Sequence, residues 1–134
     1  MIGIILIAHE NIATEMLKAL QHVAGAQTKI ECVNVFPEDD TEKKRHEILE
    51  KTQKVDGGDG IIIISDMFGG TPSNLALSIM EEKNNIEVIS GMNIPMLVKL
   101  ASMRDEAVSG AAAAAAEAGQ RYIRIASTLL KSEG

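Results

Sequence analysis

Aromatic residues are almost absent from this 134-residue chain, which has no tryptophan and only Phe36, Phe68 and Tyr122 as aromatic side chains. Hydrophobic residues still make up 46% of the chain and charged residues 24%, a balance typical of globular proteins. The core is therefore expected to be aliphatic. The length fits one domain of ordinary size, so residues 1–134 are predicted to form a single domain.

Cysteine, basic charge and long apolar runs are also scarce. Cys32 is the only cysteine, so no disulfide can form within the chain, which suits a reducing cytoplasm. No stretch approaches the roughly 20 apolar residues of a membrane-spanning helix, so no membrane insertion is expected. Lys and Arg number 13 against 19 Asp and Glu, and the net charge of -6 opposes binding to nucleic acid and favours a basic protein partner.

Apolar runs alternate with segments of helical periodicity along the chain. The runs predict strands at residues 2–8, 33–36, 60–64 and 86–90, and the periodic segments predict helices at residues 12–23, 41–54, 72–82 and 95–104. Six consecutive alanines at residues 111–116 predict a further helix that stops at Gly119, and the alternating residues 122–126 fit a short edge strand or a continued helix. The pattern predicts an α/β fold with an open, doubly wound, mainly parallel sheet flanked by helices.

Ligand sites in such sheets form at the carboxyl ends of the strands, where strand order reverses. The first predicted strand is followed by His9 and the third by Asp66. If these two strands are neighbours, the carboxylate can accept one ring N–H of His9 and leave the other nitrogen free to attack an electrophile. Strand-end histidines also serve as ordinary hydrogen-bonding residues. His22 and His46, inside predicted helices, are expected to have ordinary surface or packing roles.

The loop at residues 69–74 leads into the third predicted helix, with Thr71 as its predicted N-cap and Pro72 as its first residue. Free N–H groups at a helix start favour anions, and glycine lets the backbone approach one closely. Gly70, Thr71 and Ser73 are therefore predicted to bind a phosphoryl group. No nucleotide-binding glycine motif and no His/Cys cluster at metal spacing is present, so neither a cofactor nor a metal is expected.

Three segments together carry a resemblance to a known family: the early strand that ends in His9, residues 66–74 (DMFGGTPSN) and residues 88–97 (VISGMNIPML). The chain resembles the mannose-type enzyme IIA domains of the bacterial phosphoenolpyruvate-dependent sugar phosphotransferase system over nearly its whole length. The resemblance implies that His9 is phosphorylated, that Asp66 is its hydrogen-bonding partner, and that Gly70 and Thr71 lie near the phosphoryl group.

The same resemblance implies a phosphoryl carrier. The histidine-containing phosphocarrier protein would donate to His9, which would pass the group to a separate enzyme IIB. It also implies a fifth, antiparallel strand, here residues 122–126, often exchanged within a homodimer. Two departures concern the site, because Glu10 stands where the family often has glycine and Met67 where a threonine can follow the aspartate.

Two other functions fit the same residues. One is a phosphoryl-donor subunit for dihydroxyacetone kinase, which neighbouring kinase subunits would indicate. The other is a regulatory phosphoprotein that binds different targets in its phosphorylated and free forms.

Overall fold

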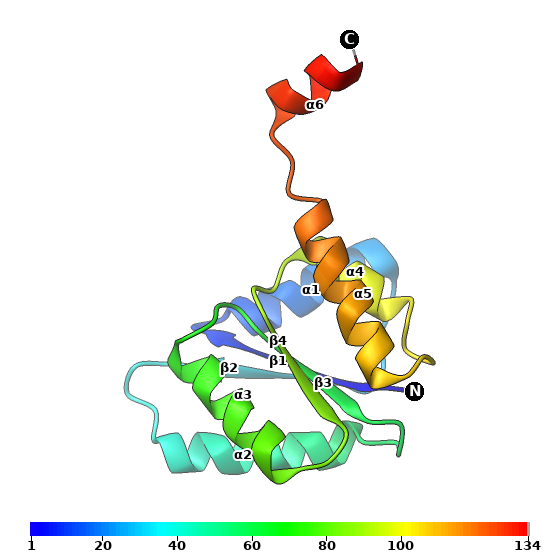
Figure 1. The fold of residues 1–134 in the computed structure, drawn as a ribbon. Coiled ribbons are helices and arrows are strands. Elements are labelled where there is room, and N and C mark those ends of the chain that lie inside the picture. Colours follow the sequence, from blue (N-terminus) through cyan, green and yellow to red (C-terminus); the bar gives the residue numbers. More distant parts are fainter. Residues whose placement is uncertain (134) are drawn as a thin grey trace.

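The computed structural model describes residues 1–133 and contains a four-stranded parallel sheet with helices on both faces (Figure 1). The strands are β1 (Gly3–His9), β2 (Ile30–Val35), β3 (Ile61–Ser65) and β4 (Ile86–Ser90). Their order is β2-β1-β3-β4, and every neighbouring pair is parallel. The predicted open, doubly wound α/β sheet is confirmed.

The two central strands, β1 and β3, carry the longest apolar runs of the sequence. All five residues of β3 are buried, and so are the six residues of β1 before His9. Helices on both faces of the sheet bury these strands, which explains why their residues do not alternate between apolar and polar. Strand order reverses between β1 and β3, so the carboxyl ends of these strands form the switch point of the fold.

The helices are α1 (Ile12–Ala24), α2 (Thr41–Val55), α3 (Thr71–Glu82), α4 (Ile94–Ala101), α5 (Val108–Arg121) and α6 (Ala126–Glu133). All of them except α6 lie in two layers (Figure 1). One layer holds α1, α4 and α5 against one hydrophobic cluster, and the other holds α2 and α3 against a second cluster across the sheet. Within residues 1–133 we find no helix with both the length and the apolar composition needed to cross a membrane.

The predicted start of α3 and the predicted end of α4 are wrong. The N-cap of α3 is Gly70 instead of Thr71, because the Gly70 carbonyl already accepts the first helical hydrogen bond, from Asn74 N at 3.0 Å. The helix predicted at residues 95–104 ends at Ala101. Arg104 turns back to the start of the sheet, where its carbonyl accepts a hydrogen bond from Ile2 N at 2.7 Å and its guanidinium donates to Ile2 O at 2.8 Å.

Gly119 does not stop the alanine-rich helix as predicted, because α5 continues to Arg121. The residue is buried against α4, and a Cβ built at position 119 would lie 3.0 Å from Met96 Cε and 3.3 Å from Asn93 Oδ1. Ala111, Ala112 and Ala115 of α5 belong to the hydrophobic cluster that α5 shares with α1 and α4. The small residues of this helix thus allow α4 and α5 to pack closely.

The predicted antiparallel strand at residues 122–126 is absent from the sheet of this chain. Residues 123–125 have no regular secondary structure, and they carry α6 away from the sheet and its helices (Figure 1). Ile123 and Ile125 are 72% and 70% exposed. Within the described chain, residues 123–125 pair with no strand of the sheet.

Candidate functional site

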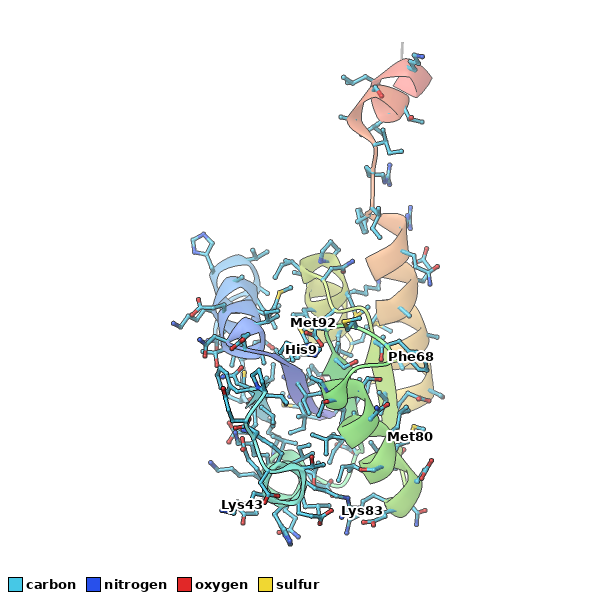
Figure 2. The ribbon with its side chains drawn as sticks, turned by 90° about the vertical axis from the view of Figure 1, so that its left-hand side faces the viewer. His9, Lys43, Phe68, Met80, Lys83 and Met92 are labelled. Carbon is cyan, nitrogen blue, oxygen red and sulfur yellow. The ribbon has the colours of Figure 1, made fainter. Side chains whose placement is uncertain are left out.

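The switch point between β1 and β3 brings His9 and Asp66 together, as the sheet order predicts. Ile7 of β1 is in register with Ser65, the last residue of β3, so Asp66 emerges beside the end of β1. Figure 2 looks toward this edge of the sheet and shows His9 at its centre, with Phe68 on the neighbouring loop.

One carboxylate oxygen of Asp66 accepts hydrogen bonds from both the ring and the backbone of His9. Oδ2 lies 2.8 Å from His9 Nδ1 and 3.0 Å from the backbone nitrogen of His9. The other oxygen, Oδ1, accepts from Met67 N at 3.0 Å. Because a carboxylate only accepts, Nδ1 carries the proton of a neutral ring, and the Nε2 lone pair is left free.

The two side chains differ in exposure, which suits different roles. The Asp66 side chain is 14% exposed, whereas that of His9 is 42% exposed and therefore open to a reactant. Burial raises the pKa of the Asp66 carboxyl, but hydrogen bonds from the His9 backbone and ring, together with the N–H of Met67, outweigh burial and hold this pKa below its usual value. Asp66 therefore stays ionised beside the ring.

Gly70 lies against the free edge of the His9 ring. A Cβ at position 70 would be 2.9 Å from His9 Cε1 and 3.2 Å from Nε2. The backbone angles of Gly70, φ -97° and ψ 178°, are open to any residue, so the requirement for glycine here is one of space and not of conformation.

The structure separates the other two residues predicted to bind a phosphoryl group. Thr71 is exposed at the first position of α3 and lines a cavity together with His9. Ser73 is fully buried, and its Oγ has no hydrogen-bond partner among the described residues. The hydroxyl of Ser73 thus has no access to a phosphoryl group on the surface in this structure.

The cavity beside His9 has a volume of about 190 Å³ and is walled by β1, the β2–α2 loop and the first turns of α2 and α3. Lys44 of α2 lines it, as do Glu10 and Asp39. The sequence motifs missed Lys44 because it lies within a charged helix. The one feature of the sequence that could have identified Lys44 is its position in the first turn of the helix after β2, because β2 ends at the same edge of the sheet as β1.

Apolar side chains border the site on the loop after β3. Phe68 is 73% exposed and Met67 54% exposed. Glu10, the departure at the end of β1, is exposed and has a positive φ of 54°. His22 and His46 are exposed, and the described part of the chain contains no cluster of three or more potential metal ligands.

Comparison with known proteins identifies a family and several relatives that are sugar phosphotransferase components. Residues 3–117 match the EIIA-man family model, described as the fructose IIA component of the phosphotransferase system (PTS). The mannose-specific EIIAB component of Escherichia coli (strain K12) is 31% identical over 105 residues, which are 78% of this chain and 32% of that protein. This chain thus spans about a third of that relative's length. The fructose-specific EIIA component of Bacillus subtilis (strain 168) is 22% identical over 78% of this chain and 72% of that protein.

Solved structures agree in fold. The PTS component EIIA from Streptococcus agalactiae superposes with a TM-score of 0.87 and 26% identity, covering 96% of this chain and 99% of that one. The mannose/sorbose-specific IIA subunit from Enterococcus faecalis gives a TM-score of 0.84 at 24% identity, over 92% of this chain and 93% of that one.

Proposed function

The chain belongs to the EIIA-man family of PTS components, and from this premise we propose that it carries a phosphoryl group on Nε2 of His9. The observation that supports this most directly is the 2.8 Å hydrogen bond between His9 Nδ1 and Asp66 Oδ2, which leaves Nε2 as the free nucleophile on an exposed ring. The donor is the histidine-containing phosphocarrier protein, and the acceptor is an enzyme IIB.

The proposed transfer needs only alignment and charge stabilisation. The Nε2 lone pair attacks the phosphorus of the donor's phosphohistidine, the P–N bond of the donor breaks, and a P–N bond to Nε2 forms. The donor ring leaves with its electron pair. The His9 ring gains positive charge while it keeps its proton on Nδ1, and the ionised Asp66 offsets this charge. Transfer to enzyme IIB is the same step in reverse.

The surroundings of His9 suit a protein reactant. The exposed Phe68 and Met67 offer apolar contact area beside the ring, and the net charge of -6 favours a basic face on the partner. We propose that the reaction takes place in the cytoplasm, where phosphoenolpyruvate and the donor protein are available.

We further propose a homodimer that exchanges residues 122–126. The outer edge of β4 has no neighbouring strand in the described chain, and the exposed Ile123 and Ile125 lie on a segment that contributes nothing to its own sheet. An antiparallel strand from a second copy would satisfy both sets of backbone groups.

Incubation with phosphoenolpyruvate, enzyme I and the phosphocarrier protein tests the proposed function. We expect one acid-labile phosphate per chain, transferred without ATP, and chelator in the final transfer step is expected to have no effect. Subsequent addition of enzyme IIB should remove the phosphate. Absence of phosphate after incubation with an active donor would contradict the proposal, while phosphate that no enzyme IIB accepts would favour the regulatory alternative.

A further inference from the structure

Lys44 is the basic side chain on the wall of the cavity beside His9. Its side chain is 17% exposed. Its Nζ lies 2.9 Å from Glu47 Oε1 and 3.6 Å from Asp39 Oδ2. The lysine thus contacts one carboxylate of its own helix and, more loosely, one on the cavity wall.

We propose that the Lys44 ammonium is the counter-ion of the phosphoryl group on His9, an inference that rests on the function proposed above. Nδ1 is occupied by Asp66, so the group must sit on Nε2, at the side of the ring next to Gly70. Thr71 follows Gly70 and lines the same cavity as Lys44. His9 and Lys44 line one cavity of about 190 Å³, so a negative charge on the His9 ring lies in the same small space as the ammonium and attracts it.

The other charged groups on the cavity wall make such a counter-ion necessary. Glu10 and Asp39 line the cavity, and both are acidic. A phosphoryl group brings about 1.5 to 2 further negative charges at neutral pH. Without Lys44, the charged side chains left on the cavity wall besides the His9 ring would be Glu10 and Asp39, which repel the new charge, while Asp66 already offsets the ring on its other side.

The ion pairs of Lys44 allow it to turn toward the phosphoryl group at little cost. The 3.6 Å contact with Asp39 is too long for a hydrogen bond. Glu47 has a second partner, Lys51 Nζ, at 2.9 Å from its Oε2. Burial raises the pKa of Glu47, but hydrogen bonds from Lys51 and Lys44 outweigh it and lower this pKa, so Glu47 keeps a charged partner if Lys44 moves.

Lys44→Gln tests the proposal, with Lys43→Gln as the matched control. Lys43 is the preceding residue of α2, is exposed, and lies on the outer side of the helix away from His9 (Figure 2). Both variants change the net charge equally. We expect Lys44→Gln to shift the transfer equilibrium with the phosphorylated phosphocarrier about three- to tenfold toward unphosphorylated His9. Lys43→Gln and Lys44→Arg should stay within about twofold of the wild type.

Phosphoramidate, a small phosphoryl donor, separates this effect from docking of a protein. The N–P bond of phosphoramidate breaks, ammonia leaves, and the N–P bond forms on Nε2. We expect Lys44→Gln to slow the initial rate of this reaction by a similar factor, and salt to reduce the difference because it screens the charges. Asp39→Asn, which loosens the hold on Lys44 and removes a negative charge, should shift the equilibrium the other way.

Each outcome separates this inference from the proposed function. Equal equilibria for Lys44→Gln and Lys43→Gln would overturn the role of Lys44 and leave His9 as the carrier. A defect with the protein donor alone would assign Lys44 to docking and also overturn the inference. Absence of phosphate on wild-type His9 with the protein donor would overturn the proposed function itself. Thermal unfolding of each variant verifies the fold, and Lys44→Met takes the place of Lys44→Gln if that variant fails to fold.

Discussion

The Asp66 carboxylate accepts hydrogen bonds from three N–H groups, two of them from His9. It therefore orients the ring and holds its proton on Nδ1. An amide at this position can turn its own N–H₂ toward the ring, which would select the wrong tautomer and remove the negative charge that supports the phosphorylated ring.

Asp66→Asn is therefore expected to fold but to transfer phosphate slowly. We expect the transfer rate to fall by roughly 30- to 1000-fold, equivalent to about 2 to 4 kcal/mol of transition-state stabilisation. Rapid-quench measurement of acid-labile phosphate gives the rate. A variant that transfers at the wild-type rate would show that the hydrogen bond is only structural.

The ionised Asp66 carboxylate should also make the free energy of unfolding depend on pH. The pKa of Asp66 is lower in the folded chain than the usual value of 3.8, so its ionised form stabilises the fold above that value, and this contribution is lost as pH falls below it. The free energy of unfolding of the wild type should thus approach that of Asp66→Asn at acid pH. If the two free energies of unfolding still differ by the same amount below pH 3, the pKa of Asp66 is not lowered in the folded chain.

Gly70→Ala should impair the site without unfolding the chain. The backbone at Gly70 tolerates alanine, but the new methyl group would lie 2.9 Å from His9 Cε1 and beside Nε2. We expect phosphorylation of His9 to slow by at least about tenfold, in line with the cost of misplacing a reacting group.

Gly110→Ala is the matched control, since Gly110 lies in α5 with open space around a built Cβ. Alanine there should raise the free energy of unfolding by about 0.5 to 1 kcal/mol and leave phosphorylation unchanged. If both variants are phosphorylated equally fast, Gly70 does not need to be small.

At the scale of the elements, sequence patterns predicted the four parallel strands and the residues at their carboxyl ends. The continuous apolar runs of β1 and β3 indicated central strands, and this alone placed His9 beside Asp66. Features that depend on contacts between elements were not predictable in this way. In the sequence, Gly119 resembles the glycine that often follows the end of a helix. In the structure it lies within α5 and packs against Met96.

Lys44 and Ser73 illustrate the same limit at the site. Lys44 belongs to a charged helix whose pattern indicates only an exposed face, and it lines the cavity because the helix start follows β2 at the same edge. Ser73 belongs to a loop-and-helix start that suggests anion binding, yet α3 turns it inward and buries its hydroxyl.

Arg104 follows α4 and binds the backbone just before β1 and β2, at the edge of the sheet opposite His9. Its guanidinium is buried and donates to the carbonyls of Ile2, Thr28 and Lys29 at 2.8, 2.8 and 3.1 Å. Burial lowers the pKa of Arg104, but its usual value is so high that the group stays charged. Loss of this side chain would remove the guanidinium as donor to all three carbonyls, of which Lys29 O keeps a hydrogen bond from Ile4 N at 3.0 Å.

We therefore expect Arg104→Met to lower the free energy of unfolding by about 2 to 4 kcal/mol. Chemical denaturation measures the loss, and Lys99→Gln, a charge removed from an exposed position of α4, is the control with an expected change below about 0.5 kcal/mol. Equal stability of the two variants would show that other donors replace the guanidinium.

At the scale of the whole molecule, residues 123–133 extend away from the sheet and belong to neither hydrophobic cluster. A chain truncated after Tyr122 keeps every strand and both hydrophobic clusters, so it should fold with nearly unchanged stability. If residues 122–126 are exchanged between copies, the truncated chain should sediment as a monomer while the full chain sediments as a dimer at micromolar concentration. A full chain that remains monomeric, or a truncated chain that stays dimeric, would contradict strand exchange.

The net charge of -6 and the exposed apolar loop at Phe68 describe a molecule whose proposed reactants are other proteins. The reaction nevertheless depends on one atom, Nε2 of His9. The most direct measurement is the amount and position of acid-labile phosphate on the wild type and on His9→Ala after incubation with phosphoenolpyruvate, enzyme I and the phosphocarrier protein. One phosphate on the peptide that contains His9, and none on His9→Ala, is the expected result. Phosphate on His22 or His46, or a His9→Ala chain labelled at the wild-type rate, would contradict the proposed function.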